Sequence, residues 1–163
     1  MHLTVSRHGQ AHRDSITGTD RDRELHPQGQ REAKFLALAL ATLDTPPDAL
    51  VASPFVRAQQ TALTINNNLG LELLTDDRLR CGVQPSTVLG IIEEYAEAKS
   101  LVLVGHNPTL DELIGLITGG VGTYGPGLRT GEAYVIDLDP ANPVGNGVIV
   151  TRIRLETQEI PTV

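Results

Sequence analysis

Two arginines and two histidines of this sequence follow short apolar runs, where side chains can do chemistry. Arg7 and His8 follow the run that begins at His2, Arg57 comes shortly after residues 49–52, and His106 follows residues 101–104. A guanidinium binds two phosphate oxygens, and an imidazole is a competent nucleophile toward phosphorus. If the three runs are neighbouring parallel strands, the four side chains meet at one sheet edge and suit a tetrahedral dianion.

The elements that must position these side chains form an α/β pattern. The four consecutive apolar residues at 101–104 predict a central strand that is covered on both faces. Further strands are expected over the run that begins at His2 and ends in Ser6-Arg7-His8-Gly9 and over residues 49–52. A short edge strand is expected over 71–74, and a hairpin of residues 133–138 and 148–155. Helices are expected from Pro27 to about Leu43, from Phe55 to a close at Gly70, from Pro85 to Ala98, and from Thr109 to about Ile117.

Two loops separate these elements. Residues 10–26 are polar, and this loop is long enough to reach over a site. Residues 119–131 are rich in glycine but lack the spacing and the lysine of a nucleotide-binding phosphate loop, so we interpret them as a flexible connector.

Length and composition limit the function classes. The 163 residues suit a single domain over residues 1–163, and the net charge of −7 disfavours a nucleic-acid or anionic-membrane partner. A local group of arginines can still attract a phosphate. The one cysteine, Cys81, excludes an internal disulfide and a cysteine-based zinc site. Without an apparent signal peptide or membrane anchor, we expect a cytoplasmic protein.

Three motifs in this order resemble those of the histidine phosphatase superfamily, which has the phosphoglycerate mutase-like fold. They are Arg7-His8-Gly9, then Ser53-Pro54 with Arg57-Ala58 and Thr61-Ala62, and Gly105-His106-Asn107-Pro108. The resemblance covers Met1 to about Leu138. The short chain, together with Leu25 and Pro27-Gln28-Gly29, is similar to the SixA-type phosphohistidine phosphatases of this superfamily.

The resemblance implies a three-layer α/β sandwich with a mostly parallel central sheet and helices on both faces. It implies that His8 is the nucleophile and becomes phosphorylated, and that Arg7, Arg57 and His106 hold the phosphoryl oxygens. His8 must attack as a neutral ring, whereas His106 would do most as a cation. Asn107 and Gly9 would help to shape the binding pocket, and neither a metal nor an organic cofactor is implied.

One departure from the family pattern concerns the general acid. Many mutases and phosphomonoesterases of the superfamily have Arg-Leu-Arg-Glu, whereas here Cys81 follows Arg78-Leu79-Arg80. A thiol replaces a carboxylic acid poorly, which favours an N–P substrate, because imidazole leaves more readily than an alkoxide. The remaining candidates for a proton donor are Asp14, Asp20, Asp22, Glu24 and Asp77.

Three functions therefore stay open. The first is hydrolysis of phosphohistidine on a partner protein, such as a signalling phosphotransfer domain. The second is a phosphomonoesterase for a small phosphate ester, with a carboxylate of the 10–26 loop as the acid. The third is a phosphate-binding module without turnover. We expect a monomer or a weak dimer in each case.

Overall fold

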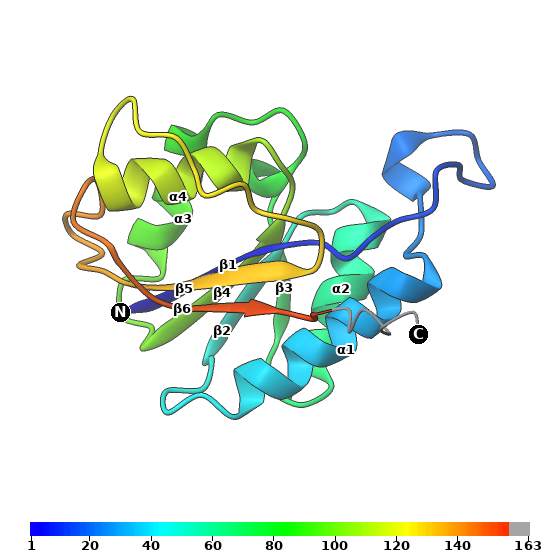
Figure 1. The fold of residues 1–163 in the computed structure, drawn as a ribbon, viewed down its shortest axis with the longest axis horizontal. Coiled ribbons are helices and arrows are strands. Elements are labelled where there is room, and N and C mark those ends of the chain that lie inside the picture. The colour runs from blue at the N-terminus through cyan, green and yellow to red at the C-terminus, as the bar shows by residue number, and fades with distance from the viewer. Residues whose placement is uncertain (157–163) are drawn as a thin grey trace, which may run out of the picture.

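A six-stranded sheet in the order β3-β2-β4-β1-β5-β6 forms the centre of the protein (Figure 1). The computed structural model describes residues 1–156. The first four strands in this order are parallel to one another. At the other side of the sheet, β5 pairs antiparallel with β1, and β6 pairs antiparallel with β5. The strands are β1 (His2–Arg7), β2 (Ala49–Ala52), β3 (Leu73–Thr75), β4 (Ser100–Gly105), β5 (Glu132–Asp137) and β6 (Val148–Arg154).

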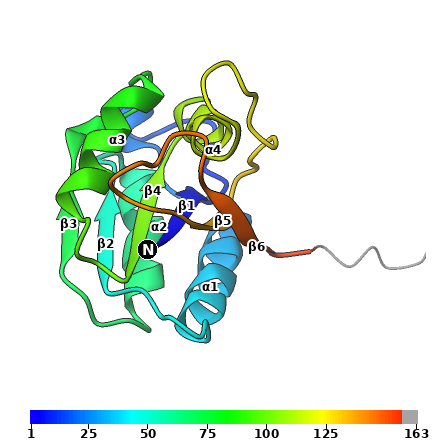
Figure 2. The ribbon, with the colours of Figure 1, turned by 90° about the vertical axis from the view of Figure 1, so that its left-hand side faces the viewer.

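Helices cover both faces of this sheet (Figures 1 and 2). Helices α1 (Pro27–Ala41) and α2 (Val56–Asn66) share one hydrophobic cluster with the sheet, and α3 (Pro85–Glu94) and α4 (Thr109–Gly119) share the other. Two short 3-10 helices, η1 (Asp20–Asp22) and η2 (Asp77–Leu79), lie in connecting segments. The predicted three-layer α/β sandwich with a mostly parallel central sheet is therefore confirmed.

The central strand β4 shows why this sequence forms buried layers. Leu101 and Leu103 pack into the cluster under α3 and α4, whereas Val102 and Val104 pack into the cluster under α1 and α2. Successive strand residues point to opposite faces, so a strand buried on both sides must be apolar throughout. The prediction of a central strand over residues 101–104 is confirmed.

Two predicted helix ends are wrong. Helix α2 ends at Asn66 rather than near Gly70, because the Asn66 side chain both donates to the Leu71 carbonyl (2.6 Å) and accepts from the Leu71 amide (2.8 Å). Helix α3 ends at Glu94 rather than Ala98. The chain has to turn there, because the Lys99 and Ser100 amides bind the Asp48 carboxylate at the start of β4.

The loop of residues 120–131 is tied to α4 and reaches the carboxyl end of β1. The Asp111 carboxylate accepts hydrogen bonds from the amides of Gly127 (2.8 Å) and Leu128 (2.7 Å), and the Gly131 amide donates to the His8 carbonyl (2.9 Å). The segment interpreted as a flexible connector thus borders the candidate site. No helix within residues 1–156 has the length and apolar character that crossing a membrane requires.

Candidate phosphoryl-binding site

The strands β2, β4 and β1 are neighbours, and their carboxyl ends bring the predicted residues together. The Ser53 amide donates to the Val104 carbonyl (2.9 Å), and the His8 amide donates to the Gly105 carbonyl (3.1 Å), which locks the three ends side by side. His8 and His106 consequently face each other, with ring centroids 5.1 Å apart. The expected convergence of the strand ends is present.

Both ring nitrogens of His8 are held. Its Nδ1 lies 2.7 Å from the Gly9 carbonyl oxygen, which can only accept, so Nδ1 carries the hydrogen of the neutral ring. Its Nε2 accepts a hydrogen bond from Nε of Arg57 at 3.2 Å. The lone pair is therefore on Nε2, the nitrogen that lies beside the guanidinium.

Arg57 connects His8 with the 10–26 loop. Its guanidinium is buried, with 3% of the side chain exposed, and it donates to the Asp20 carbonyl (2.8 Å), to the Asp20 carboxylate (3.1 Å) and to the sulfur of Cys81 (3.3 Å). The guanidinium also lies over the Phe55 ring at 5.1 Å, a cation–π contact. Its position at the start of α2 opposes the helix dipole, and these contacts offset that cost.

Burial keeps both histidines neutral in the ligand-free site. Burial is the main cause that lowers the pKa of His8 to about 4; the hydrogen bond to the Gly9 carbonyl opposes this shift, and the charges of Arg57 and Arg7 add to it. Burial, followed by the proximity of His8 and Arg57, lowers the pKa of His106 to about 3. The free protein at neutral pH therefore carries His106 as a neutral ring, mainly because burial disfavours the charged form. The role of His106 as a cation concerns the ring beside a phosphoryl group and stays a prediction.

Arg7 and Asn107 meet at the Leu128 carbonyl. Nη1 of Arg7 donates to it at 3.2 Å and Nδ2 of Asn107 at 2.6 Å. Within residues 1–156, Nε of Arg7, Oδ1 of Asn107 and Nδ1 of His106 are buried without any hydrogen-bond partner. Buried polar atoms without partners are uncommon, so this group of three indicates a place for a polar ligand.

Gly9 has a packing role beside the site. A Cβ atom on Gly9 would lie 2.5 Å from the Gly29 carbonyl oxygen, so only glycine permits this approach of α1. The Gly9 amide donates to Oγ1 of Thr61 (3.0 Å), and its carbonyl accepts from His8. Because both polar backbone groups are occupied, Gly9 orients His8 and offers no free amide to a substrate.

Among the candidate proton donors, Asp20 is the one in contact with Arg57. Burial raises the pKa of Asp20, but hydrogen bonds from Arg23 (2.8 Å) and Arg57 outweigh burial and leave the pKa below its ordinary value. Asp20 is therefore ionised at neutral pH. Burial raises the pKa of the Cys81 thiol above its ordinary value, so this group stays protonated and is a very weak acid.

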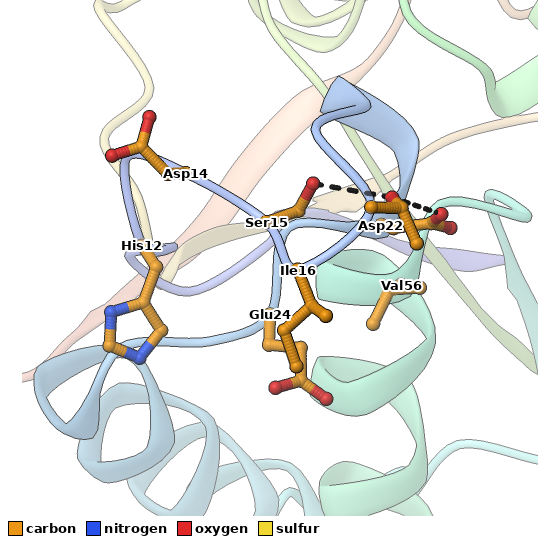
Figure 3. Close-up of a pocket in the computed structure, with 8 residues that line it drawn as sticks. His12, Asp14, Ser15, Ile16, Asp22, Glu24 and Val56 are labelled. Atoms are coloured by element: carbon orange, nitrogen blue, oxygen red, sulfur yellow. Dashed lines mark hydrogen bonds between the residues drawn. The ribbon is translucent and has the colours of Figure 1, made fainter.

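The other carboxylates lie away from these contacts. Asp14, Asp22 and Glu24 line a hollow of about 630 Å³ between the 10–26 loop and Val56 at the start of α2 (Figure 3). Hydrogen bonds from Thr17 and Thr19 hold the Asp22 carboxylate and lower its pKa. Asp77 is exposed on η2.

Three contributors were not predicted as site residues. The Ser53 hydroxyl lies 2.7 Å from Nε2 of His106, Thr61 links Gly9 to the Arg57 carbonyl, and Leu128 supplies the carbonyl between Arg7 and Asn107. Ser53 and Thr61 belong to the quoted motifs, so their position beside Arg57 was a usable signal. A backbone carbonyl such as that of Leu128 gives no such signal. No group of three or more metal-ligating side chains occurs within residues 1–156.

Comparisons with known proteins agree with this geometry. The family model described as "Histidine phosphatase superfamily (branch 1)" matches residues 3–80. A phosphohistidine phosphatase SixA homolog of Haemophilus influenzae is 28% identical over 130 residues, which cover 73% of this chain and 78% of the relative. An uncharacterized protein of Picosynechococcus is 31% identical over 144 residues, covering 85% and 84% of the two chains.

The fold is also found among solved structures. The structure of the protein histidine phosphatase SixA complexed with tungstate superimposes with a TM-score of 0.82. The match covers 94% of this chain and 97% of that one, at 23% sequence identity.

Proposed function

The chain belongs to the histidine phosphatase superfamily, and from this premise we propose that it removes phosphoryl groups from phosphohistidine on a partner protein. We treat residues 1–163 as one catalytic domain. The SixA homolog of Haemophilus influenzae, named a phosphohistidine phosphatase, supports this choice of substrate.

In the first step of the proposed reaction, the Nε2 lone pair of His8 attacks phosphorus. The N–P bond of the substrate breaks, the electron pair passes to the leaving imidazole, and that imidazole takes its proton from solvent. In the second step a water attacks the phosphorus atom of phosphorylated His8, and the bond between phosphorus and Nε2 breaks. The products are inorganic phosphate, a released proton and His8 with its lone pair restored.

Arg7, Arg57 and His106 would bind the phosphoryl oxygens during both steps. Phosphoryl transfer depends mainly on positioning and on electrostatic stabilisation of the oxygens. The two guanidiniums next to the neutral His8 provide the hydrogen-bond donors for these oxygens, so the proposed reaction uses no metal ligands. When a dianion displaces the Asp20 carboxylate from Arg57, it gains the hydrogen bonds that Asp20 now occupies.

The choice of substrate depends on the protonation state of the two acidic groups that contact Arg57. Asp20 is ionised and Cys81 is a very weak acid, so neither can efficiently protonate an alkoxide. An alkyl phosphate needs such a proton, because its leaving group is strongly basic. Phosphohistidine releases an imidazole instead of an alkoxide, so this site suits phosphohistidine better than an alkyl phosphate.

A comparison of three substrates tests the proposal. Phosphate release is measured from a phosphohistidine-bearing phosphotransfer protein, from p-nitrophenyl phosphate and from an unactivated alkyl phosphate, with His8→Ala as the control. We expect turnover of the first two and at most a trace with the third. Fast alkyl phosphate turnover would overturn the choice of substrate in favour of a phosphomonoesterase. Phosphohistidine hydrolysis that persists in His8→Ala would overturn the mechanism.

A further inference from the structure

The hydroxyl of Ser53 makes the shortest polar contact to His106. Its Oγ lies 2.7 Å from Nε2 of the ring, and the same oxygen accepts the Phe55 amide at 3.3 Å. Ser53 is fully buried and His106 is 2% exposed, so solvent does not compete for either group. The Phe55 ring packs edge-on against His106, with centroids 5.0 Å apart, and limits rotation of the imidazole.

Counting donors and acceptors decides the direction of this hydrogen bond. The hydroxyl of Ser53 has one hydrogen and two lone pairs, and the Phe55 amide uses one lone pair. Among residues 1–156, Nε2 of His106 is the only acceptor in reach of that hydrogen. If Nε2 carried the ring hydrogen instead, both the Ser53 hydrogen and the Nδ1 lone pair would be buried without a partner.

The opposite arrangement satisfies more groups. When Ser53 donates to Nε2, the neutral ring carries its hydrogen on Nδ1, and only that N–H is left without a partner. A buried, unpaired N–H is costly unless a ligand accepts it. Nε of the neighbouring Arg7 is a second buried donor without a partner, and a ligand with acceptor oxygens satisfies both donors. Oδ1 of Asn107 is an acceptor, so oxygens that only accept do not complete it.

We propose that Ser53 is a positioning residue that fixes the tautomer of His106, so that Nδ1–H is presented to a phosphoryl oxygen. This inference rests on the proposed function for the identity of the ligand. Ser53 itself does not touch the substrate and acts through His106. The consequence is that neutral His106 is already a hydrogen-bond donor before any proton is taken up, which removes the need for a cation in the free site.

The direct test uses the free wild-type protein and does not depend on turnover. Nitrogen-15 NMR of histidine-labelled protein distinguishes a protonated from an unprotonated ring nitrogen, and His106→Asn identifies the signals. At neutral pH we expect the hydrogen of His106 on Nδ1, and we expect inorganic phosphate to perturb that Nδ1–H signal. A hydrogen on Nε2, or an Nδ1 signal that saturating phosphate leaves unchanged, would overturn the inference.

Variants supply the functional readout. Ser53→Ala should give a mixture of His106 tautomers and lower kcat about tenfold, a part of the 100- to 1,000-fold loss typical of a missing donor. Ser53→Thr, which keeps a hydroxyl, should restore the single tautomer. The matched control is Ser100→Ala, because Ser100 is equally buried and its hydroxyl has no partner within residues 1–156.

The outcomes separate the two proposals. An unchanged tautomer and unchanged kcat in folded Ser53→Ala would contradict the role of Ser53. A wild-type His106 with its hydrogen on Nδ1 in a protein that does not hydrolyse phosphohistidine would instead contradict the proposed substrate, and would leave the role of Ser53 supported.

Discussion

Arg57 donates its Nε–H to Nε2 of His8 across 3.2 Å. A single guanidinium therefore holds the proposed nucleophilic atom and lies where it can also bind the phosphoryl group that this atom attacks. The bond must break when Nε2 attacks phosphorus, and the freed N–H can then turn to a phosphoryl oxygen. Arg57 is buried at the start of α2, and Thr61 of the same helix binds the Gly9 amide. One helix thereby positions both the nucleophile and the cation.

Arg57→Lys should lower kcat for phosphohistidine about 100- to 1,000-fold while the protein stays folded. An ammonium group keeps the charge but lacks the planar fork that serves His8 and the phosphoryl oxygens together. The measurement is steady-state phosphate release. Arg31→Lys on the exposed face of α1 is the control, and a loss in Arg57→Lys no larger than in this control would contradict the role of Arg57.

Asp20→Asn should tighten inhibition by inorganic phosphate about fivefold. The Asp20 carboxylate occupies a hydrogen-bond donor of Arg57 and repels an incoming phosphate dianion. Removing the negative charge weakens both the competition for Arg57 and the repulsion of phosphate. An exposed ion pair is typically worth up to about 1 kcal/mol. The inhibition constant of phosphate gives the answer. Asp77→Asn, in an exposed residue away from these contacts, should leave it unchanged. Weaker phosphate inhibition in Asp20→Asn would show that the carboxylate serves mainly to position Arg57.

Cys81→Glu should raise alkyl phosphate turnover relative to phosphohistidine turnover by at least about tenfold. The sulfur of Cys81 lies 3.3 Å from Arg57, so a carboxyl group introduced there reaches the site. When a phosphoryl dianion occupies Arg57, its negative charge favours the protonated form of this carboxyl group, which can then supply a proton, a contribution typically of about 100- to 10,000-fold. The ratio of the two rates is the readout. Cys81→Gln is the matched control, and an equal rise in that variant would rule out proton donation as the cause.

The acidity of the two buried histidines predicts a pH dependence of stability. The pKa of His8 is about 4 and that of His106 about 3, both below the ordinary value near 6.5. The unfolded chain therefore takes up protons first, and the free energy of unfolding falls as the pH drops from about 6.5 toward 4 and 3. For His8 the shift corresponds to about 3 kcal/mol.

Urea unfolding between pH 7 and pH 4 measures this loss of stability, and histidine NMR titration follows each ring. In His8→Asn the fall should be smaller by about the contribution of His8. Bound phosphate should raise both pKa values, because a dianion favours the imidazolium form. Titration of both free rings near pH 6.5 would contradict the account.

The sequence allowed the arrangement of the strands to be predicted better than the contacts between loops. The apolar run at residues 101–104 favours a strand that is buried on both faces, and residues at adjacent parallel strand ends converge. In contrast, Asp20 meets Arg57 across 37 positions of the chain, and this pairing depends on how the 10–26 loop folds back. The same holds for the Leu128 carbonyl, which Asp111 places beside Arg7.

The neutral state of His106 in the free protein could also not be predicted from the sequence. An exposed imidazole has an ordinary pKa near 6.5, so the residue type alone gives no sign that the ring is neutral in the free protein. The shift comes from complete burial next to His8 and Arg57, and burial of this kind depends on packing of the whole sheet edge.

The most direct measurement of the central claim is trapping of the phosphorylated enzyme. Wild-type protein is mixed with a phosphohistidine-bearing phosphotransfer protein, quenched at alkaline pH within milliseconds, and mapped by mass spectrometry. We predict an alkali-stable, acid-labile phosphoryl group on His8, absent in His8→Ala and reduced in Arg57→Lys. Release of phosphate by the wild-type protein without any phosphoryl group on His8 at any time of quenching would contradict the covalent mechanism.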